Sequence, residues 1–104
     1  MQSGPSTVQP FASPFTIVRR KRVQAETGYS RSTIYLRIAQ GLWPKPVSLG
    51  PRAVGWPAHE VEAINAARIA GRSDEAIRAL VASLEAARGA ADRATDLEAE
   101  SEQP

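Results

Sequence analysis

In residues 28–41, GYSRSTIYLRIAQG, a polar first turn precedes two aliphatic residues with helical spacing. Ser30 is placed to cap a helix, because its side-chain oxygen accepts from the free N–H groups of the first turn. Ile34 and Ile38 are four residues apart and share one helical face. The segment therefore predicts a helix over residues 31–40 that buries both isoleucines and ends at a left-handed glycine.

A shorter helix is predicted just before it. The run FTIVRRKRVQAETG, residues 15–28, places four consecutive basic residues ahead of Val23 and Ala25. The simplest prediction is a helix over about residues 21–27 that is ended by Gly28. The two helices and their tight turn predict a helix-turn-helix unit, whose second helix lies in the DNA major groove with its N-terminal residues against bases and phosphates.

The polar first turn of the second helix then has a functional explanation. The residues expected to face DNA are Ser30, Arg31, Ser32 and Thr33. Arg31 would bind guanine through two hydrogen bonds, and Leu36 would meet a thymine methyl group. Free N–H groups at the helix start would assist at a phosphate. The alternative is that these residues form a strong N-cap on an ordinary surface helix.

Residues 42–57, LWPKPVSLGPRAVGWP, predict a β-hairpin. Val47 and Leu49 alternate with a serine, and residues 50–53 supply the turn. The apolar sides of both strands are expected to close over the buried isoleucines of the second helix. Two prolines before the first strand remove backbone donors there, which is typical of a sheet edge.

The hairpin carries one basic residue at each end. Arg52 lies at its tip and Lys45 at its base, where a wing contacts the DNA backbone or the minor groove. Taken alone, Arg52 is equally well explained as an ordinary exposed loop charge.

The charge of the chain is divided unevenly. The net charge is +2, but residues 1–56 hold eight basic residues and one acidic residue, a net +7, while residues 57–104 hold five basic and ten acidic residues, a net −5. Such asymmetry indicates that the first half meets a polyanion. Within the run RRKR, Arg20 and Lys21 would grip phosphates, the alternative being a solvated charge run.

Between about residues 15 and 70, the order and spacing of many residues are those of a known family. The residues are Thr27-Gly28, Ser30, Thr33-Ile34-Tyr35, Ile38, Gly41, Trp43-Pro44-Lys45-Pro46-Val47, Leu49-Gly50, Gly55-Trp56 and Glu60-Val61. In these residues the chain resembles the AlpA family of prophage regulators, which is similar to MerR-type winged helix-turn-helix domains and phage excisionases. The resemblance implies sequence-specific DNA binding that controls prophage or other mobile-element genes, and sometimes excision.

The resemblance also implies roles for particular residues. Carried over position by position, it assigns DNA contacts to Ser30, Arg31, Ser32, Thr33, Tyr35 and Arg37. The chain departs from the family pattern at Leu36 and Arg37, where a basic residue followed by an aliphatic one is commoner. That departure would redirect base readout.

Two further helices are predicted in the second half. Pro57 suits the first position of a helix to about Ala70, with Val61 and Ile64 on one face. Gly71 ends this helix.

The last predicted helix lies in residues 72–91. Ser73 caps its start, and the helix carries an apolar stripe. The stripe consists of Ile77, Leu80, Val81 and Leu84. Burying each of them contributes about 1.5 to 3 kcal/mol, so something must cover the stripe. Either the helix folds back onto its own domain or two copies dimerise through it. Dimerisation is favoured, because the winged domain already has a core and two half-sites strengthen DNA binding.

The predicted fold class is mainly α with a small β-hairpin wing: a winged helix-turn-helix DNA-binding domain plus an additional C-terminal helix. A chain of 104 residues supplies one small domain with a modest core. The predicted parts are a disordered leader (1–14), the winged domain (15–71), the amphipathic helix (72–91) and an acidic disordered tail (92–104).

Several functional classes have little support. The chain has no cysteine, and its one histidine, His59, has no nucleophile or second ligand at a meaningful spacing, so we expect no enzyme, metal, cofactor or small-molecule ligand. It has neither a membrane-spanning run nor a secretion signal, and a cytoplasmic, nucleoid-associated protein of a bacterium or phage is expected. The expected partner is double-stranded DNA. An excisionase-like architectural factor and a protein-binding adaptor that uses the 77–84 stripe are the alternatives.

Overall fold

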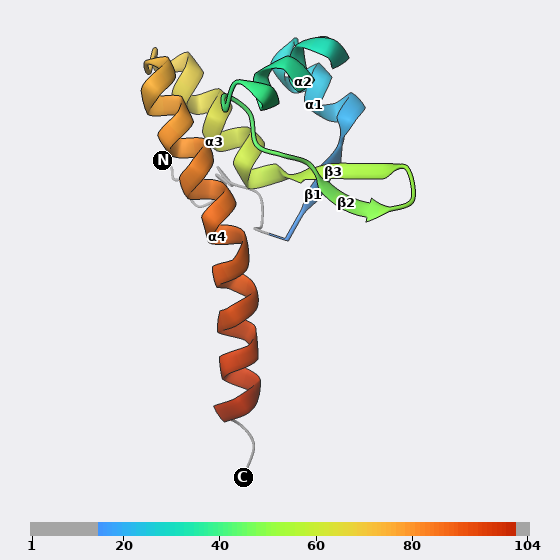
Figure 1. Ribbon diagram of the computed structural model, residues 1–104, viewed down its shortest axis with the longest axis vertical. Helices are drawn as coiled ribbons and strands as arrows, with labels where there is room; N and C mark the ends of the chain where they lie inside the picture. The colour runs from blue at the N-terminus through green and yellow to red at the C-terminus, as the bar shows by residue number, and fades with distance from the viewer. Residues whose placement is uncertain (1–14, 102–104) are drawn as a thin grey trace, which may run out of the picture.

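Two short helices and a hairpin lie at one side of the molecule, and a pair of longer helices lies at the other (Figure 1). The computed structural model describes the backbone of residues 15–101 and the side chains of residues 15–89; the predicted leader lies outside the described residues. The elements are β1 (Ile17–Arg19), α1 (Arg20–Thr27), α2 (Arg31–Ala39), β2 (Val47–Gly50), β3 (Ala53–Pro57), α3 (Ala58–Ile69) and α4 (Asp74–Ser101). The fold is mainly helical with a small antiparallel sheet, a winged helix-like domain followed by a C-terminal helix.

The helix pair α1 and α2 is confirmed, although α1 begins one residue earlier than predicted and α2 ends one residue earlier. α1 ends at Gly28, which adopts a φ of 78°, a conformation that costs glycine little, and donates its N–H to the Gln24 carbonyl at 2.8 Å. α2 begins after Ser30, whose Oγ accepts from the Thr33 N–H at 3.1 Å. Of the two isoleucines predicted to be buried, Ile34 is fully buried, whereas Ile38 is only partly buried against the core.

The sheet has a third strand, β1, that the sequence analysis did not predict. The strand order is β1-β3-β2, all antiparallel, with Val18 opposite Trp56. Three residues are too few to show an alternating pattern, and the only local signal is the β-branched run from Thr16 to Val18. β2 lies at the edge of the sheet, as its preceding prolines indicate.

The apolar residues of β2 do not close over the helices as predicted. Ser48 pairs with Val54, which packs against the core, so the neighbouring side chains of β2 point to the outer face of the sheet. Leu49 is 41% exposed there. It lies with Ile17 over Gly55, where an added Cβ would stand only 2.6 Å from the Ile17 Cγ2. This close approach requires a glycine.

Two tryptophans lie at the centre of the core. Trp56 is fully buried and donates its Nε1–H to the Pro44 carbonyl at 2.8 Å. Trp43 is also buried and meets the ring of Tyr29 edge-on, with ring centres 6.0 Å apart. Around them lie Val18, Val23, Ile34, Leu42, Val61, Ile64, Ile77 and Val81. Pro57, predicted as the first residue of a helix, is instead the last residue of β3 and precedes α3.

The apolar stripe of α4 is covered by its own chain. Ile77 is fully buried and Val81 is only 4% exposed, while Leu80 and Leu84 pack partly buried against the same core. Of the two predicted alternatives, the structure has the helix folded back beside α3 (Figure 1). Ile77 and Val81 therefore offer almost no surface through which a second copy could dimerise.

α4 is longer than predicted. Its helical backbone continues to Ser101, whereas the sequence predicted an end near residue 91 and a disordered tail, and its second half extends beyond the rest of the molecule (Figure 1). Residues 92–101 contain no glycine or proline and include alanine, glutamate, leucine and arginine, which are strong helix formers. In the described part of the chain, no helix combines the length and apolar character needed to cross a membrane.

Candidate nucleic-acid interface

The face of α2 that points away from the buried Ile34 and the partly buried Ile38 is exposed. Tyr35 is 38% exposed and Leu36 is 57% exposed, and Arg31 and Ser32 are exposed beside them. The Arg31 guanidinium lies over the Tyr35 ring, 6.0 Å from its centre and one turn away on the helix. This cation–π contact joins two of the predicted DNA-binding side chains at the outer surface.

Two hydroxyl groups of the first turn, those of Ser30 and Thr33, stabilise the start of the helix. The Ser30 Oγ accepts from the Thr33 N–H and donates to the Thr33 Oγ1 at 2.9 Å. The Ser32 Oγ lies 3.3 Å from the Ser30 Oγ. Thr33 is half-buried. Ser30 and Thr33 therefore fix the start of α2, and Ser32 is the hydroxyl whose helical position lies on the exposed face.

Arg37 lies away from this face. It is two residues beyond Tyr35, a rotation of about 200° around the helix. Its guanidinium lies 5.6 Å from the ring centre of Tyr29, which itself packs against Trp43. The structure thus does not bring Arg37 together with Arg31 and Tyr35, and its cation stacks on an aromatic ring beside the core.

A second basic group lies where the start of α1 meets the hairpin. A concavity of about 340 Å³ is lined by Arg19, Arg20, Lys21, Arg52 and Val54. The Arg19 Nε donates to the Val54 carbonyl at 3.0 Å, and the Arg20 Nε donates to the neutral amide oxygen of Gln24 at 3.1 Å. The structure therefore brings together the predicted residues Arg20, Lys21 and Arg52. Arg19 is an additional member; its only sequence signal was the basic run itself.

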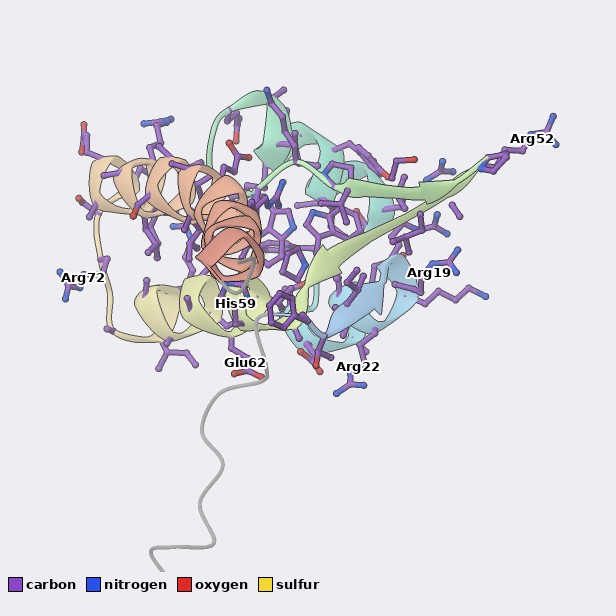
Figure 2. All side chains as sticks on the ribbon, turned by 90° about the horizontal axis from the view of Figure 1, so that it is seen from below. Arg19, Arg22, Arg52, His59, Glu62 and Arg72 are labelled. Atoms are coloured by element: carbon purple, nitrogen blue, oxygen red, sulfur yellow. The ribbon has the colours of Figure 1, made fainter. Side chains whose placement is uncertain are left out.

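Arg52 occupies the tip of the hairpin, away from the body of the molecule (Figure 2). The turn is tighter than predicted, because Gly50 pairs directly with Ala53 and leaves only Pro51 and Arg52 between them. In the part of the chain that the structure describes, Arg52 is the one residue other than glycine with a positive φ, 60°. Turn propensity favours glycine or asparagine at such an angle, and side chains held this way concentrate at functional sites.

The cations of the two halves differ in their partners. In the second half, Arg68 pairs with Asp74 and Arg88 with Glu60. In the first half, the one salt bridge within the described residues joins Arg22 to Glu26. The cations there without a carboxylate partner among the described residues include Arg19, Arg20, Lys21, Arg31 and Arg52. The uneven charge of the sequence thus becomes an uncompensated positive surface over α1, α2 and the hairpin.

Lys45 lies just before β2 with an exposed side chain, at the base of the hairpin as predicted. Its backbone is held by α4 on both sides: its N–H donates to the Glu85 Oε2 and its carbonyl accepts from the Arg88 Nη2, each at 2.8 Å. α4 therefore fixes the backbone from which this side chain projects.

The part of the chain that holds these elements is similar to known proteins. The family model of the prophage CP4-57 regulatory protein (AlpA) matches residues 16–68, from β1 nearly to the end of α3. The uncharacterized protein ORF88 of Enterobacteria phage P4 is 56% identical over 45 residues, which are 43% of this chain and 51% of that protein, so the chain spans about half the length of this relative. No solved structure matches the chain. Because the family match covers half of its residues, the chain belongs to the AlpA family of prophage regulatory proteins.

Proposed function

We propose that this chain is a sequence-specific DNA-binding regulator of prophage or other mobile-element genes, with α2 in the major groove and the β2–β3 hairpin as a wing. The observation that carries the proposal is the Arg31–Tyr35 pair, which stands on an exposed face of α2 beside further polar groups. Family membership supports a regulatory role. The function is binding rather than catalysis, and it is exerted in the cytoplasm, where phage and bacterial DNA lie.

Base readout is assigned to the exposed face of α2. The Arg31 guanidinium is free of carboxylates among the described residues and has the planar fork that binds the O6 and N7 of guanine. Leu36, with more than half of its surface exposed, provides an apolar contact for a thymine methyl group. Ser32 and Tyr35 add hydroxyl groups that bind bases or phosphates.

Backbone contacts are assigned to the basic concavity and the hairpin. Arg19, Arg20 and Lys21 line a hollow of one charge sign, which suits a phosphate. Arg52 extends from the tip of the hairpin, where it reaches the backbone or the minor groove. These contacts position the protein, and α2 supplies the sequence preference.

The experiment that tests the proposal is selection of duplexes from a randomised double-stranded DNA pool by the full chain. We expect a consensus to be enriched, and the selected duplex to bind at least about 1,000-fold more tightly than a scrambled duplex of the same composition. The affinity should fall steeply with salt, because several phosphates are neutralised. Absence of enrichment, or equal affinity for the selected and scrambled duplexes, would contradict the proposal.

A further inference from the structure

Hydrogen bonds from α4 hold the linker between the proposed recognition helix and the wing. This linker, residues 40–46, joins α2 to β2. The Arg78 Nε donates to the carbonyl of Gln40, the C-cap residue of α2, at 2.8 Å. At the other end, Glu85 accepts from the Lys45 N–H and Arg88 donates to the Lys45 carbonyl. Both ends of the linker are thus attached to the same helix.

The three side chains come from one side of α4. Arg78 and Glu85 are seven residues apart, about two helical turns, and Arg88 follows Glu85 by three residues. The backbone of Gly41 also approaches Arg78: a Cβ added there would lie 3.7 Å from the Arg78 Cγ and Cδ. The linker therefore runs along this side of α4 instead of hanging free between α2 and β2.

α4 is itself fixed to the domain. Its residues Ile77 and Val81 belong to the core, and Arg88 binds the buried carboxylate of Glu60 on α3 with two hydrogen bonds. Arg78, Glu85 and Arg88, which bind the linker, therefore project from a helix that is itself anchored to the core. The family match ends at residue 68, so this support comes from a part of the chain outside the matched domain.

We infer that Arg78, Glu85 and Arg88 are positioning residues for DNA recognition: they fix the orientation of α2 relative to the wing by holding the linker at both ends. The inference rests on the proposed DNA-binding function. A helix and a hairpin that enter neighbouring grooves must keep one relative geometry, and supporting hydrogen bonds maintain such geometry. The three residues need not touch DNA.

The first test compares Glu85→Ala with Glu85→Gln, using the selected duplex and its scrambled counterpart. Both variants remove one negative charge, which by electrostatics alone strengthens binding to DNA. Only Glu85→Ala also removes the acceptor for the Lys45 N–H, because the glutamine side-chain oxygen still accepts. We expect Glu85→Ala to bind the selected duplex about fivefold or more weakly than Glu85→Gln. We expect the two variants to bind the scrambled duplex alike.

The second test compares Arg78→Met with Arg72→Met. Both replace an exposed arginine and remove one positive charge, but Arg72 lies far from the hairpin tip and has no side-chain bond to the linker (Figure 2). Methionine keeps much of the length that packs near Gly41 and loses the donor to Gln40. The ratio of selected to scrambled affinity should fall about fivefold or more in Arg78→Met and stay unchanged in Arg72→Met. Arg78→Lys, which retains a donor, should restore part of the ratio.

A measurement without DNA tests the hold of α4 on the linker separately from the proposed DNA binding. Amide hydrogen exchange at Lys45 should be faster in Glu85→Ala than in Glu85→Gln, since only the alanine variant frees that N–H. If the wild-type chain selects no duplex, the proposed function fails, and this exchange measurement still tests the hold on the linker. Equal exchange in the two variants, or equal DNA selectivity within both pairs of variants, would overturn the inference.

Discussion

Arg88 of α4 binds the carboxylate of Glu60 on α3 through two hydrogen bonds, Nε to Oε2 at 2.9 Å and Nη2 to Oε1 at 2.7 Å. The Glu60 side chain is fully buried, and that of Arg88 keeps 25% of its surface exposed. The hydrogen bond to Glu60 raises the pKa of Arg88 above its ordinary value, against an opposing effect of desolvation. This salt bridge joins α4 to the domain that the AlpA family shares.

Removing one partner of the Arg88–Glu60 pair should strongly destabilise the chain. Arg88→Met leaves a buried carboxylate without its cation, and the free energy of unfolding in urea should fall by about 3 to 5 kcal/mol. The double variant Arg88→Met with Glu60→Met should recover most of this loss, because no buried charge remains. A single variant that loses less than about 1 kcal/mol would show that the pair is dispensable.

The Arg88 contribution should not vary across the neutral pH range. A raised folded-state pKa gives stability that is fully present below the unfolded-state pKa and is lost only as the pH rises through the folded value. For an arginine both values lie far above neutral pH. Urea unfolding at several neutral pH values should therefore give the same difference between the wild type and Arg88→Met. A difference that disappears within this range would mean that another titrating group controls the pair.

Ser30 should contribute to stability through its cap. Ser30→Ala removes the acceptor for the Thr33 N–H, so the free energy of unfolding should fall by about 1 kcal/mol. Ser30→Asn keeps an acceptor at this position and should stay close to the wild type in thermal melts. If the alanine and asparagine variants melt together, the Ser30 hydroxyl does not act as a cap.

Ile77 should act within one chain and not between two. Ile77→Ala should lower the free energy of unfolding by about 2 to 5 kcal/mol, since its side chain is part of the core. Because the stripe is covered by its own domain, the melting midpoint of the wild type should not change with protein concentration. The exposed Ser83→Ala on the same helix serves as the control. A midpoint that rises with concentration and loses this dependence in Ile77→Ala would indicate dimerisation through the stripe.

Arg52 should strengthen DNA binding without adding to the stability of the fold. Its positive φ is tolerated better by asparagine, so Arg52→Asn should melt at the same temperature as the wild type or slightly higher. The same change should weaken binding to selected and scrambled duplexes alike and reduce the slope of log affinity against log salt by about 1. Arg72→Asn controls for the lost charge. Unchanged affinity and slope in Arg52→Asn would show that the tip of the wing does not contact DNA.

Local signals were sufficient for the helix-turn-helix unit. The cap at Ser30, the left-handed Gly28 and the four-residue spacing of Ile34 and Ile38 each depend on neighbours in sequence. The ends of α1 and α2 lie within one residue of the predicted ones. The basic surface could also be anticipated, because the charge of residues 1–56 is visible without any fold.

Features that depend on tertiary packing could not be predicted in this way. β1 is too short to show a pattern, and the outward direction of Leu49 follows from pairing between Ser48 and Val54. The Arg88–Glu60 pair joins residues 28 positions apart on different helices, and no local spacing indicates it. The apolar stripe predicted a covered face, but only the fold shows that its own domain covers it.

Whether the exposed face of α2 reads DNA is decided by the affinity of the double variant Arg31→Ala with Tyr35→Ala for the selected duplex. Both side chains lie at the surface of α2, so the melting midpoint should match that of the wild type. We expect a loss of about 100-fold in affinity for the selected duplex, with a much smaller change for the scrambled duplex. A folded double variant that binds the selected duplex as tightly as the wild type would contradict the claim that this face of α2 reads DNA.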